Sequence, residues 1–491
     1  MFAPLLPEDV NPKTLLDYLE NQAGLLIGRC EGVYAFPHRS FQEYLAVCHL
    51  ANNEPDFAAR LRDLVWQDLD WWREAFLLGV GKKRQGGLGD AVNAINALIP
   101  EEPDDVGEST PRHWQAAALA GEALLELRQL SQVAEQPHYR AVIKRVKAWL
   151  RALVEEGRLA PRERLQAGDI LGRLGDPRPG VGVIAGPDGT PTVPDLAWVA
   201  IPAGPFTMGS ETEDPDAFDD EKPAHRLELL AFRIGRYPVT NAQYRPFVEA
   251  GGYDQPEWWT EAGWAWRWGA EADLSAIDDE DFKKRYADWL AGRPAERRDR
   301  PYWWDEPQWG AATRPVVGVT WYEATAYCRW LTARLRASDK LAEHARVRLP
   351  TEAEWEKTAR GPQGYRWPWG DSWEEDRANT EEAGLGETSP VGLFPQGASP
   401  YGVYDLAGNV WEWTGSLWGR TSIRRPDYRY PYDPHDGREQ EDRSALFVVR
   451  GGSWDYVRRY ARAASRFGCR PGDFSDVLGF RVVVSLANSE F

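Results

Sequence analysis

The chain has 491 residues, enough for two or three domains of roughly 100–200 residues each. Hydrophobic residues make up 43% and charged residues 27%, a composition typical of folded globular proteins rather than disordered ones. The formal net charge of −18 argues against nucleic acid as a partner, because phosphate binding needs clustered lysine and arginine. An acidic excess also keeps a protein soluble, so the charge alone identifies no partner.

Targeting signals and cysteine usage bear on the compartment. Residues 1–9 lack the basic and long apolar segments of a secretion signal, and no apolar run reaches the roughly 18–20 residues that span a bilayer. The four cysteines (Cys30, Cys48, Cys328 and Cys469) lie far apart and form no Cys-x-x-Cys pair. We therefore expect a reduced, cytoplasmic protein with free thiols and no membrane insertion.

Residues 1–180 predict an all-α helical domain without catalytic motifs. Helix starts and apolar spacing place helices after Asn11-Pro12, from a capping box at 40–43, after Thr110-Pro111, and over 137–156 and 161–174. A linker rich in proline and glycine follows at 181–196. We therefore expect a second folding unit to begin near residue 197.

Residues 197–491 predict an α+β domain with much irregular structure. Short apolar strands alternate with turns, and three helices are predicted where Thr240, Thr320 and Thr351 each precede Gln or Glu by three positions. Most of the 25 tryptophans lie in this part of the chain, where they suit loop-rich cores and binding surfaces alike. Residues 252–310, rich in tryptophan and acidic residues, form a predicted insertion that would wall or shield a site.

Seven sequence blocks in a fixed order carry a family resemblance. They lie at 201–210, 237–241, 315–321, 349–356, 367–370, 405–413, and in the pair 450–454 with 479–483. Among them are Leu-Pro-Thr-Glu-Ala-Glu-Trp-Glu, Gly-Asn-Val-Trp-Glu-Trp and Arg-Gly-Gly-Ser-Trp. This part of the chain resembles formylglycine-generating-enzyme-like (sulfatase-modifying factor) domains. The resemblance implies a C-type-lectin-like fold, with few helices packed on twisted antiparallel strands.

A second resemblance concerns the N-terminal part. Residues 36–46, Phe-Pro-His-Arg-Ser-Phe-Gln-Glu-Tyr-Leu-Ala, look like the segment that follows the NTPase module of NACHT-type signalling ATPases. The chain contains no Gly-x-x-x-x-Gly-Lys-Ser/Thr loop, so we expect no nucleotide site of that kind. Either the chain is a fragment of a longer protein or it keeps only the helical tail. A signalling NTPase is therefore one candidate partner.

The resemblance also implies which chemistry to look for. The family's oxidases resemble a copper–thiolate enzyme with two cysteines soon after the Gly-Gly-Ser-aromatic block, because soft sulfur selects Cu(I). Residues 455–461 contain no cysteine, and Cys469 alone cannot supply the pair. The related ergothioneine-type sulfoxide synthases use histidine-ligated iron, and the seven histidines here show no metal spacing. We therefore expect no copper and predict that the chain is not an enzyme, with altered chemistry left as an alternative.

Calcium is the metal that the resemblance leaves open. Family members carry it around the Gly-Asn-x-Trp-Glu-Trp segment, and a second family site begins earlier in the chain. The matching ligand positions are Asp405, Gly408, Val410 and Glu412 for one site and Asn379 and Thr380 for the other. Two carboxylates with carbonyl oxygens suit a hard cation. The alternative is that Asp405 and Glu412 hydrogen-bond loop backbone without metal.

Residues 455–478 lie between two fixed blocks, as a variable binding segment on a rigid scaffold would. Some of its residues, with neighbours in the frame, follow a regular pattern that predicts a structural role: Arg462, Ala464, Arg466, Pro471, Gly479 and Arg481. The residues between them mix aromatic, basic and acidic side chains, which are frequent anchors in interfaces. The candidate ligand-binding residues are Asp455, Tyr456, Val457, Arg459, Tyr460, Ser465, Phe467, Cys469, Arg470, Asp473, Phe474, Ser475 and Asp476.

This pattern is similar to the variable region of proteins diversified by diversity-generating retroelements. We therefore predict a recognition protein that binds a protein or other macromolecular ligand, and no nucleic acid. Three alternatives stay open: an ordinary family member with a polar loop, an enzyme of altered chemistry, and a sensor or partner domain of a NACHT-type ATPase.

Overall fold

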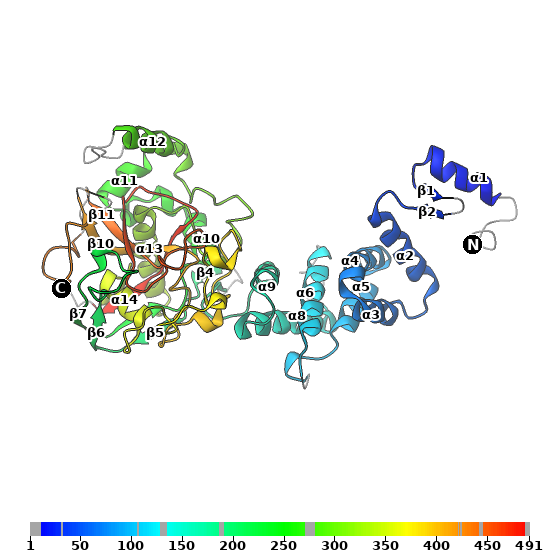
Figure 1. Ribbon diagram of the computed structural model, residues 1–491, viewed down its shortest axis with the longest axis horizontal. Coiled ribbons are helices and arrows are strands. Elements are labelled where there is room, and N and C mark those ends of the chain that lie inside the picture. Colours follow the sequence, from blue (N-terminus) through cyan, green and yellow to red (C-terminus); the bar gives the residue numbers. More distant parts are fainter. Residues whose placement is uncertain are drawn as a thin grey trace. The chain divides into compact units, whose positions relative to one another are not determined.

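The computed structural model describes residues 11–30, 33–105, 108–127, 135–185, 191–270, 280–420, 422, 425–440 and 445–486. The chain forms two compact units, Met1–Leu150 and Arg151–Phe491 (Figure 1). The division lies before the linker expected at 181–196, because helix α9 (Pro161–Leu174) belongs to the second unit. Across the described ranges, no helix is both long and apolar enough to cross a bilayer.

The described part of the first unit begins with a short α-helix and a π-helical turn, η2 (Tyr18–Gln22), followed by a hairpin. Asn11 caps helix α1 (Pro12–Asp17), as its Asn-Pro signal predicts, and strands β1 (Ile27–Cys30) and β2 (Val33–Ala35) pair antiparallel. The hairpin is absent from the all-α prediction. Helix α2 (Arg39–Asn53) begins one residue before Ser40, and His38 at its N-cap makes no side-chain capping bond. The capping box predicted at 40–43 is therefore wrong, and Glu43 instead pairs with Arg39 at 2.7 Å.

The remaining helices of this unit bury their apolar faces against one another. Their most buried side chains, which include Leu61, Phe76, Ile95 and Leu124, are fully removed from solvent. The indole N–H of Trp149 donates to the Glu101 carbonyl at 2.8 Å and ties a helix to a loop. The elements are α3 (Phe57–Gln67), α4 (Leu69–Gly86), α5 (Leu88–Leu98), η3 (Pro103–Asp105), α6 (Pro111–Glu126) and α8 (Pro137–Glu156), of which the end from Arg151 is counted with the second unit.

Helix α9 is tied to the second unit by buried arginines. The Arg314 guanidinium pairs with Asp169 of α9 and with Glu387, each at 2.6 Å. Arg178, just after α9, pairs with Asp176 at 2.7 Å and donates to the Val391 carbonyl at 2.9 Å. The expected linker contains a hairpin of β3 (Val183–Ala185) and β4 (Pro191–Pro194), whose connection lies outside the described residues.

Two four-stranded sheets, the β3-β4 hairpin and a second hairpin form the described β structure of the second unit. The first sheet is antiparallel in the order β5-β8-β14-β9, and the second has the order β12-β11-β10-β13 with β10 and β13 parallel. The strands are β5 (Trp198–Ile201), β8 (Phe232–Gly235), β9 (Ala345–Arg348), β10 (Trp411–Gly419), β11 (Leu446–Arg450), β12 (Arg466–Cys469), β13 (Leu478–Phe480), β14 (Val483–Leu486), and the paired β6 (Gly204–Met208) and β7 (His225–Leu229). The expected α+β class is confirmed.

Local capping signals position the helices of this unit. Helices α10 (Asn241–Glu249), α13 (Trp321–Ala337) and α14 (Glu352–Arg360) begin at the three predicted boxes, where Thr240, Thr320 and Thr351 accept from the backbone N–H three positions on. Aromatic residues fill the core beside them; Trp321 stacks on Phe447 with ring centroids 3.9 Å apart. Short 3₁₀ turns connect the elements, including η4 (Asp219–Glu221), η8 (Glu375–Arg377), η9 (Glu381–Ala383) and η10 (Pro395–Gly397).

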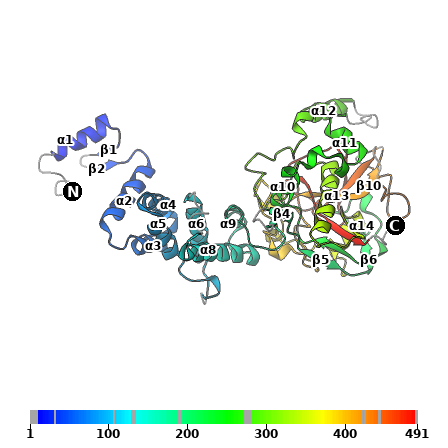
Figure 2. The same cartoon turned by 180° about the vertical axis from the view of Figure 1, so that it is seen from behind.

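The predicted insertion at 252–310 is largely helical. It contains η5 (Gly252–Asp254), η6 (Pro256–Trp258), α11 (Glu261–Arg267), α12 (Glu280–Ala291) and η7 (Ala295–Arg297), while residues 271–279 lie outside the described residues. Trp259 and Trp266 join the core of the unit. Helices α11 and α12 lie at the end of the unit opposite β5 and β6 (Figures 1 and 2).

Candidate functional site

Buried ion pairs hold the residues that flank the candidate site. Arg462 pairs with Glu221, and Arg466 pairs with both oxygens of Glu352 at 2.6 and 2.8 Å. Arg481 binds both oxygens of Glu412 at 2.5 and 2.6 Å, and Arg450 binds Glu352 and Glu356. All four arginines are at most 2% exposed. A charge buried this deeply needs its partner, so these pairs fix a rigid frame.

Within 455–478 the structure separates exposed from buried candidates. Tyr456, Val457 and Phe467 are 36%, 40% and 42% exposed. Other candidates are exposed or half-buried at the same surface: Asp455, Arg459, Tyr460, Cys469, Arg470, Asp473, Ser475 and Asp476. Two expectations need correction, because Ser465 is fully buried and Phe474 is only 3% exposed. Phe474 is covered by Trp289 of α12, with ring centroids 4.2 Å apart.

A small cavity, which we call the aromatic pocket, lies between α12 and the second sheet. It has a volume of about 270 Å³. Strand β10 contributes Trp411, β12 contributes Phe467 and Cys469, and α12 contributes Trp289. The remaining wall residues that concern us are Tyr286, Tyr456, Asp473, Phe474 and Ser475. The predicted insertion therefore does wall a cavity beside the variable segment.

Ionisable groups of the aromatic pocket are shifted by burial. The Tyr286 hydroxyl donates to the Asp473 carboxylate, which also accepts the Arg470 backbone N–H at 2.9 Å. Burial raises the pKa of Asp473 above its ordinary value, and it raises the pKa of the Cys469 thiol well above the ordinary range. A thiol of raised pKa stays protonated and is a poor nucleophile at neutral pH.

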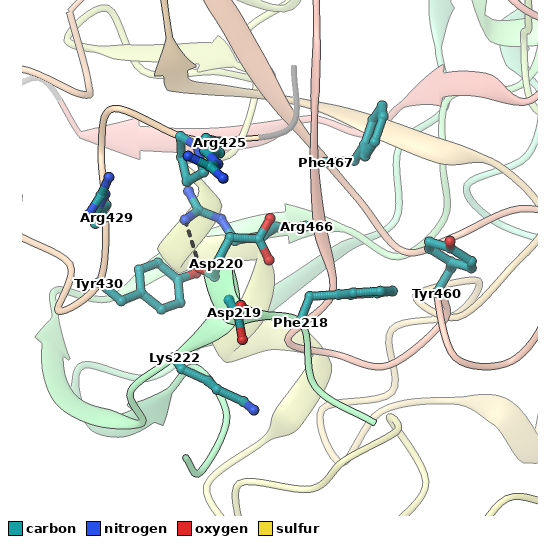
Figure 3. A pocket seen from close by; sticks show the side chains of 11 residues that line it. Phe218, Asp219, Asp220, Lys222, Arg425, Arg429, Tyr430, Tyr460, Arg466 and Phe467 are labelled. Atoms are coloured by element: carbon teal, nitrogen blue, oxygen red, sulfur yellow. Dashed lines mark hydrogen bonds between the residues drawn. The ribbon is translucent and has the colours of Figure 1, made fainter. Parts of the chain in front are cut away.

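A larger cavity of about 720 Å³, which we call the polar cleft, adjoins this pocket and shares Phe467 with it. Figure 3 shows Phe218, Tyr460 and Phe467 on one side of the polar cleft and Arg425 and Arg429 on the other. The acidic side chains Asp219 and Asp220, with Lys222, come from η4 and the residue after it. The polar cleft thus presents an apolar wall facing groups of both charges.

Asp220 is the most perturbed carboxyl of the polar cleft. Burial raises its pKa from 3.8 to about 6, although the neighbouring Arg466 opposes the shift. The Arg466 guanidinium donates to the backbone carbonyl of Asp220 at 3.2 Å (Figure 3), not to its carboxylate. One carboxylate oxygen of Asp220 is buried without a hydrogen-bond partner. The charge of Asp220 in the polar cleft therefore changes near pH 6.

The carboxylates matched to the first calcium site already accept hydrogen bonds within the protein, and calcium there stays a prediction. Glu412 is committed to Arg481, and one of its oxygens also accepts the indole N–H of Trp355 at 2.7 Å, so it has little capacity for a cation. Asp405 accepts the Gly392 backbone N–H at 2.7 Å, and burial raises its pKa to about 6. The Gly408 carbonyl accepts the Val410 N–H at 2.9 Å. This set fits the metal-free alternative.

The second predicted calcium site, at Asn379 and Thr380, has different hydrogen-bond contacts. Asn379 keeps a buried side-chain oxygen without a hydrogen-bond partner, and the Thr380 hydroxyl donates to Glu382 at 2.7 Å. Among the described residues, no group of three or more histidine, cysteine, aspartate or glutamate side chains could hold a metal ion. Calcium at Asn379 stays a prediction, for which a calcium titration followed by thermal melting is the test.

Several cavity residues were absent from the candidate set. Phe218 and Asp220 precede β7, and Arg425 and Arg429 follow β10, far from 455–478 in sequence. No local motif marks them, since they reach the cleft only through the fold. The single available signal was the tryptophan-rich composition of the insertion, which supplies Trp289.

Comparison with known families assigns the second unit. Residues 186–486 match the family model of the sulfatase-modifying factor enzyme 1-like domain. The chain belongs to this family. Residues 8–50 match the winged helix-turn-helix domain C-terminal to NACHT. Both resemblances inferred from the sequence blocks are thereby confirmed. We refer to the second unit as the formylglycine-generating-enzyme-like (FGE-like) domain.

Individual relatives include enzymes. The chain is 36% identical over 292 residues to the hercynine oxygenase of Mycolicibacterium smegmatis, covering 55% of this chain and 56% of that protein. It is 32% identical over 316 residues to the inactive C-alpha-formylglycine-generating enzyme 2 of Bos taurus, covering 58% and 86%. The chain spans about half the length of the hercynine oxygenases it matches.

Among solved structures, Treponema denticola variable protein 1 aligns over 59% of this chain and 95% of its own, with 21% identity and a TM-score of 0.38. The prediction that this chain is not an enzyme is wrong on these comparisons, because hercynine oxygenases are among its relatives at 36% and 37% identity. The missing cysteine pair excludes one route of catalysis and does not exclude others.

Proposed function

We propose that the FGE-like domain is a recognition domain whose ligand-binding surface is built around residues 455–478. The observation that carries the proposal is the gathering of Trp289, Tyr456 and Phe467, each 36–42% exposed, around one pocket. Large apolar side chains grouped at a surface mark interaction sites more often than scattered ones do. Aromatic residues on a rigid support are also the commonest interface anchors.

Residues 455–478 include buried residues that support the fold and exposed residues that can contact a ligand, and a diversifiable surface requires both. Arg462 and Arg466 are buried in ion pairs, whereas Tyr456, Val457 and Phe467 are exposed on the same stretch of chain. Exposed positions can therefore change while the buried pairs persist. This arrangement supports the variable-protein type of recognition, with a protein or other macromolecule as ligand.

An enzyme of the FGE-like family is the second candidate, favoured by the hercynine oxygenase relatives. The aromatic pocket would then hold a substrate rather than part of a binding partner. A direct assay is the consumption of hercynine under air by the full chain, with Phe467→Ala as the matched variant. Turnover that Phe467→Ala abolishes would support catalysis at this pocket.

The test of the recognition proposal is a selection from a displayed peptide library on the full chain. Enriched peptides should bind at least tenfold more weakly to Tyr456→Ala and Phe467→Ala, while the melting temperature of both variants stays unchanged. Leu230→Ala is the matched control, because Leu230 is 57% exposed and lines neither cavity. Peptides that bind wild type and both site variants equally would contradict the proposal.

A signalling NTPase is the proposed partner of the N-terminal part. The family model matched there is named for its position after NACHT, and helix α2 exposes Phe41, Tyr44 and Leu45 by 40–50%. Such an apolar helix face is suited to docking on another protein. Co-purification with a NACHT-type NTPase that is lost on Tyr44→Asp and Leu45→Asp would support this partner, and retention would contradict it.

A further inference from the structure

The aromatic pocket is small and dominated by rings. Six of its wall residues are aromatic: Tyr286, Trp289, Trp411, Tyr456, Phe467 and Phe474. Its volume of about 270 Å³ lies just below the roughly 300–1,000 Å³ of pockets that enclose a whole drug-sized ligand. The pocket therefore suits a head group or side chain rather than an entire large molecule.

Arginine covers several aromatic rings of this domain, both at the pocket and elsewhere. Arg459 lies 4.1 Å from the ring centroid of Phe218, and Arg466 lies 4.5 Å from that of Tyr430. In the pocket itself, the rings of Tyr286 and Phe474 are covered by Arg470 and Arg293, respectively. The rings of Trp289, Trp411, Tyr456 and Phe467 have no arginine or lysine over them among the described residues.

These four rings all line the pocket. Trp411, only 4% exposed, meets Tyr456 at 89° with centroids 5.7 Å apart, and it lies 6.4 Å from Phe467. Trp289 lines the same pocket from α12 and stacks with one face on Phe474. A ring face carries negative charge density, so several faces around one space attract a cation within about 6 Å.

Hydrogen-bonding capacity inside the pocket is limited. Asp473 accepts from the Tyr286 hydroxyl and from the Arg470 backbone, and the Ser475 hydroxyl donates to Asp476 at 3.1 Å. A primary ammonium has three N–H groups to satisfy, and the one carboxylate of the wall, Asp473, already accepts two hydrogen bonds, so burying that ammonium is costly. A methylated ammonium keeps its charge but has few or no donors to satisfy.

The electrostatic surroundings are consistent with a cation. Asp473 lies in the wall, and Asp455 and Asp476 lie near enough to each other to interact electrostatically. Two guanidinium groups oppose a cation beside the wall, Arg470 over Tyr286 and Arg293 over Phe474. The chain as a whole carries a formal charge of −18, which favours the approach of a cation.

We propose that the aromatic pocket is a cage for a methylated ammonium group, enclosed by Trp289, Trp411, Tyr456 and Phe467. This proposal rests on the proposed recognition function and specifies the chemistry of its ligand. Two sources carry that chemistry, a small molecule of choline type and a methylated lysine side chain of a protein. The exposed rings of Trp289, Tyr456 and Phe467 leave the pocket open to either source.

Calorimetric titration of the full chain with choline and with 3,3-dimethylbutan-1-ol tests the cage. The two molecules have nearly the same shape, and only choline carries the charge. We expect choline to bind at least tenfold more tightly. Phe467→Leu and Trp289→Leu should reduce that preference at least fivefold, whereas Trp268→Leu should preserve it, because Trp268 is 59% exposed in the same insertion and lines no part of the pocket.

A trimethyllysine peptide, compared with its unmodified form, tests the protein source in parallel. A preference for the methylated peptide together with weak choline binding assigns the cage to a protein ligand, and the reverse assigns it to a small molecule. Equal binding of choline and its neutral isostere would overturn the cage. If neither choline nor the methylated peptide binds while selected peptides still require Tyr456 and Phe467, the cage fails and the recognition proposal stands.

Discussion

Arg466 and Phe467 are neighbours in β12, yet they belong to different parts of the domain. Arg466 points inward, is 2% exposed, and holds both oxygens of Glu352. Phe467 points outward, is 42% exposed, and lines both cavities. Since successive strand residues face opposite sides of a sheet, one strand can hold the frame with one side chain and present ligand contacts with the next. Stability and recognition can thus be altered separately.

The largest effect is expected when the frame is broken. Arg481→Ala leaves Glu412 buried without its partner, which typically costs about 3–5 kcal/mol. We expect the FGE-like domain of this variant to unfold at a much lower urea concentration than wild type, or to be unfolded without urea. Tryptophan fluorescence during a urea titration measures this change. Arg346→Ala is the control, since Arg346 is exposed on strand β9. A stability equal to wild type for Arg481→Ala would mean that the pair does not hold the frame.

Phe474→Ala sharpens the comparison, because Phe474 lies in the candidate segment but is buried. Removing a buried phenylalanine side chain costs about 3–5 kcal/mol through lost burial and the cavity left behind. We expect a clear loss of stability in the same urea titration, together with release of α12, whose Trp289 stacks on Phe474. A variant as stable as wild type would place Phe474 on the surface, as the sequence alone suggested.

Asp220→Asn should increase the stability of the domain, and the size of the increase should depend on pH. The folded-state pKa of Asp220 is about 6, above its ordinary 3.8, so the folded chain binds a proton that the unfolded chain has released between those values. Stability contributed by this group therefore falls as pH rises from about 4 to 6 and stays low above 6. Asn at this position should stabilise the domain at pH 7.5, by up to about 3 kcal/mol, and much less at pH 4.

Asp219→Asn is the matched control for that experiment, because Asp219 is its exposed neighbour in the same 3₁₀ turn. It should leave the pH dependence of the melting temperature as in wild type. A gain from Asp220→Asn that is equal at pH 4 and pH 7.5 would show that the substitution acts through contacts rather than through the proton.

The smallest effect on stability is expected at the exposed rings. Tyr456→Ala and Phe467→Ala remove side chains that are more than a third exposed, and surface substitutions usually change stability by less than about 0.5 kcal/mol. Their melting curves should overlay that of wild type, while the binding of selected ligands falls. A loss as large as that of Phe474→Ala would remove the distinction between frame and surface.

Local signals in the sequence predicted the parts of the fold that depend on a few neighbouring residues. The capping boxes at Thr240, Thr320 and Thr351 placed three helices correctly, since the bonds involved span only three positions. The assignment of α9 to the second unit escaped prediction, because tertiary contacts such as Arg314 with Asp169 decide it. The pairing of β1 with β2 also escaped prediction, although it is local.

The candidate site shows the same limit. Its exposed members Tyr456 and Phe467 could be inferred from their position between fixed blocks. The burial of Phe474 could not, because the side chain that covers it, Trp289, lies in an insertion distant in sequence. The commitment of Glu412 to Arg481 was likewise hidden, since a glutamate that pairs with a buried arginine and one that binds calcium look alike in a motif.

The most direct measurement is a comparison of two displayed libraries of the full chain, both sorted for folding by resistance to protease. One library randomises the exposed positions Asp455, Tyr456, Val457, Arg459 and Phe467, and the other randomises the buried arginines Arg450, Arg462, Arg466 and Arg481. Our account predicts that most members of the first library stay folded and yield binders to new ligands, whereas few members of the second stay folded. Equal survival of the two libraries would contradict the account.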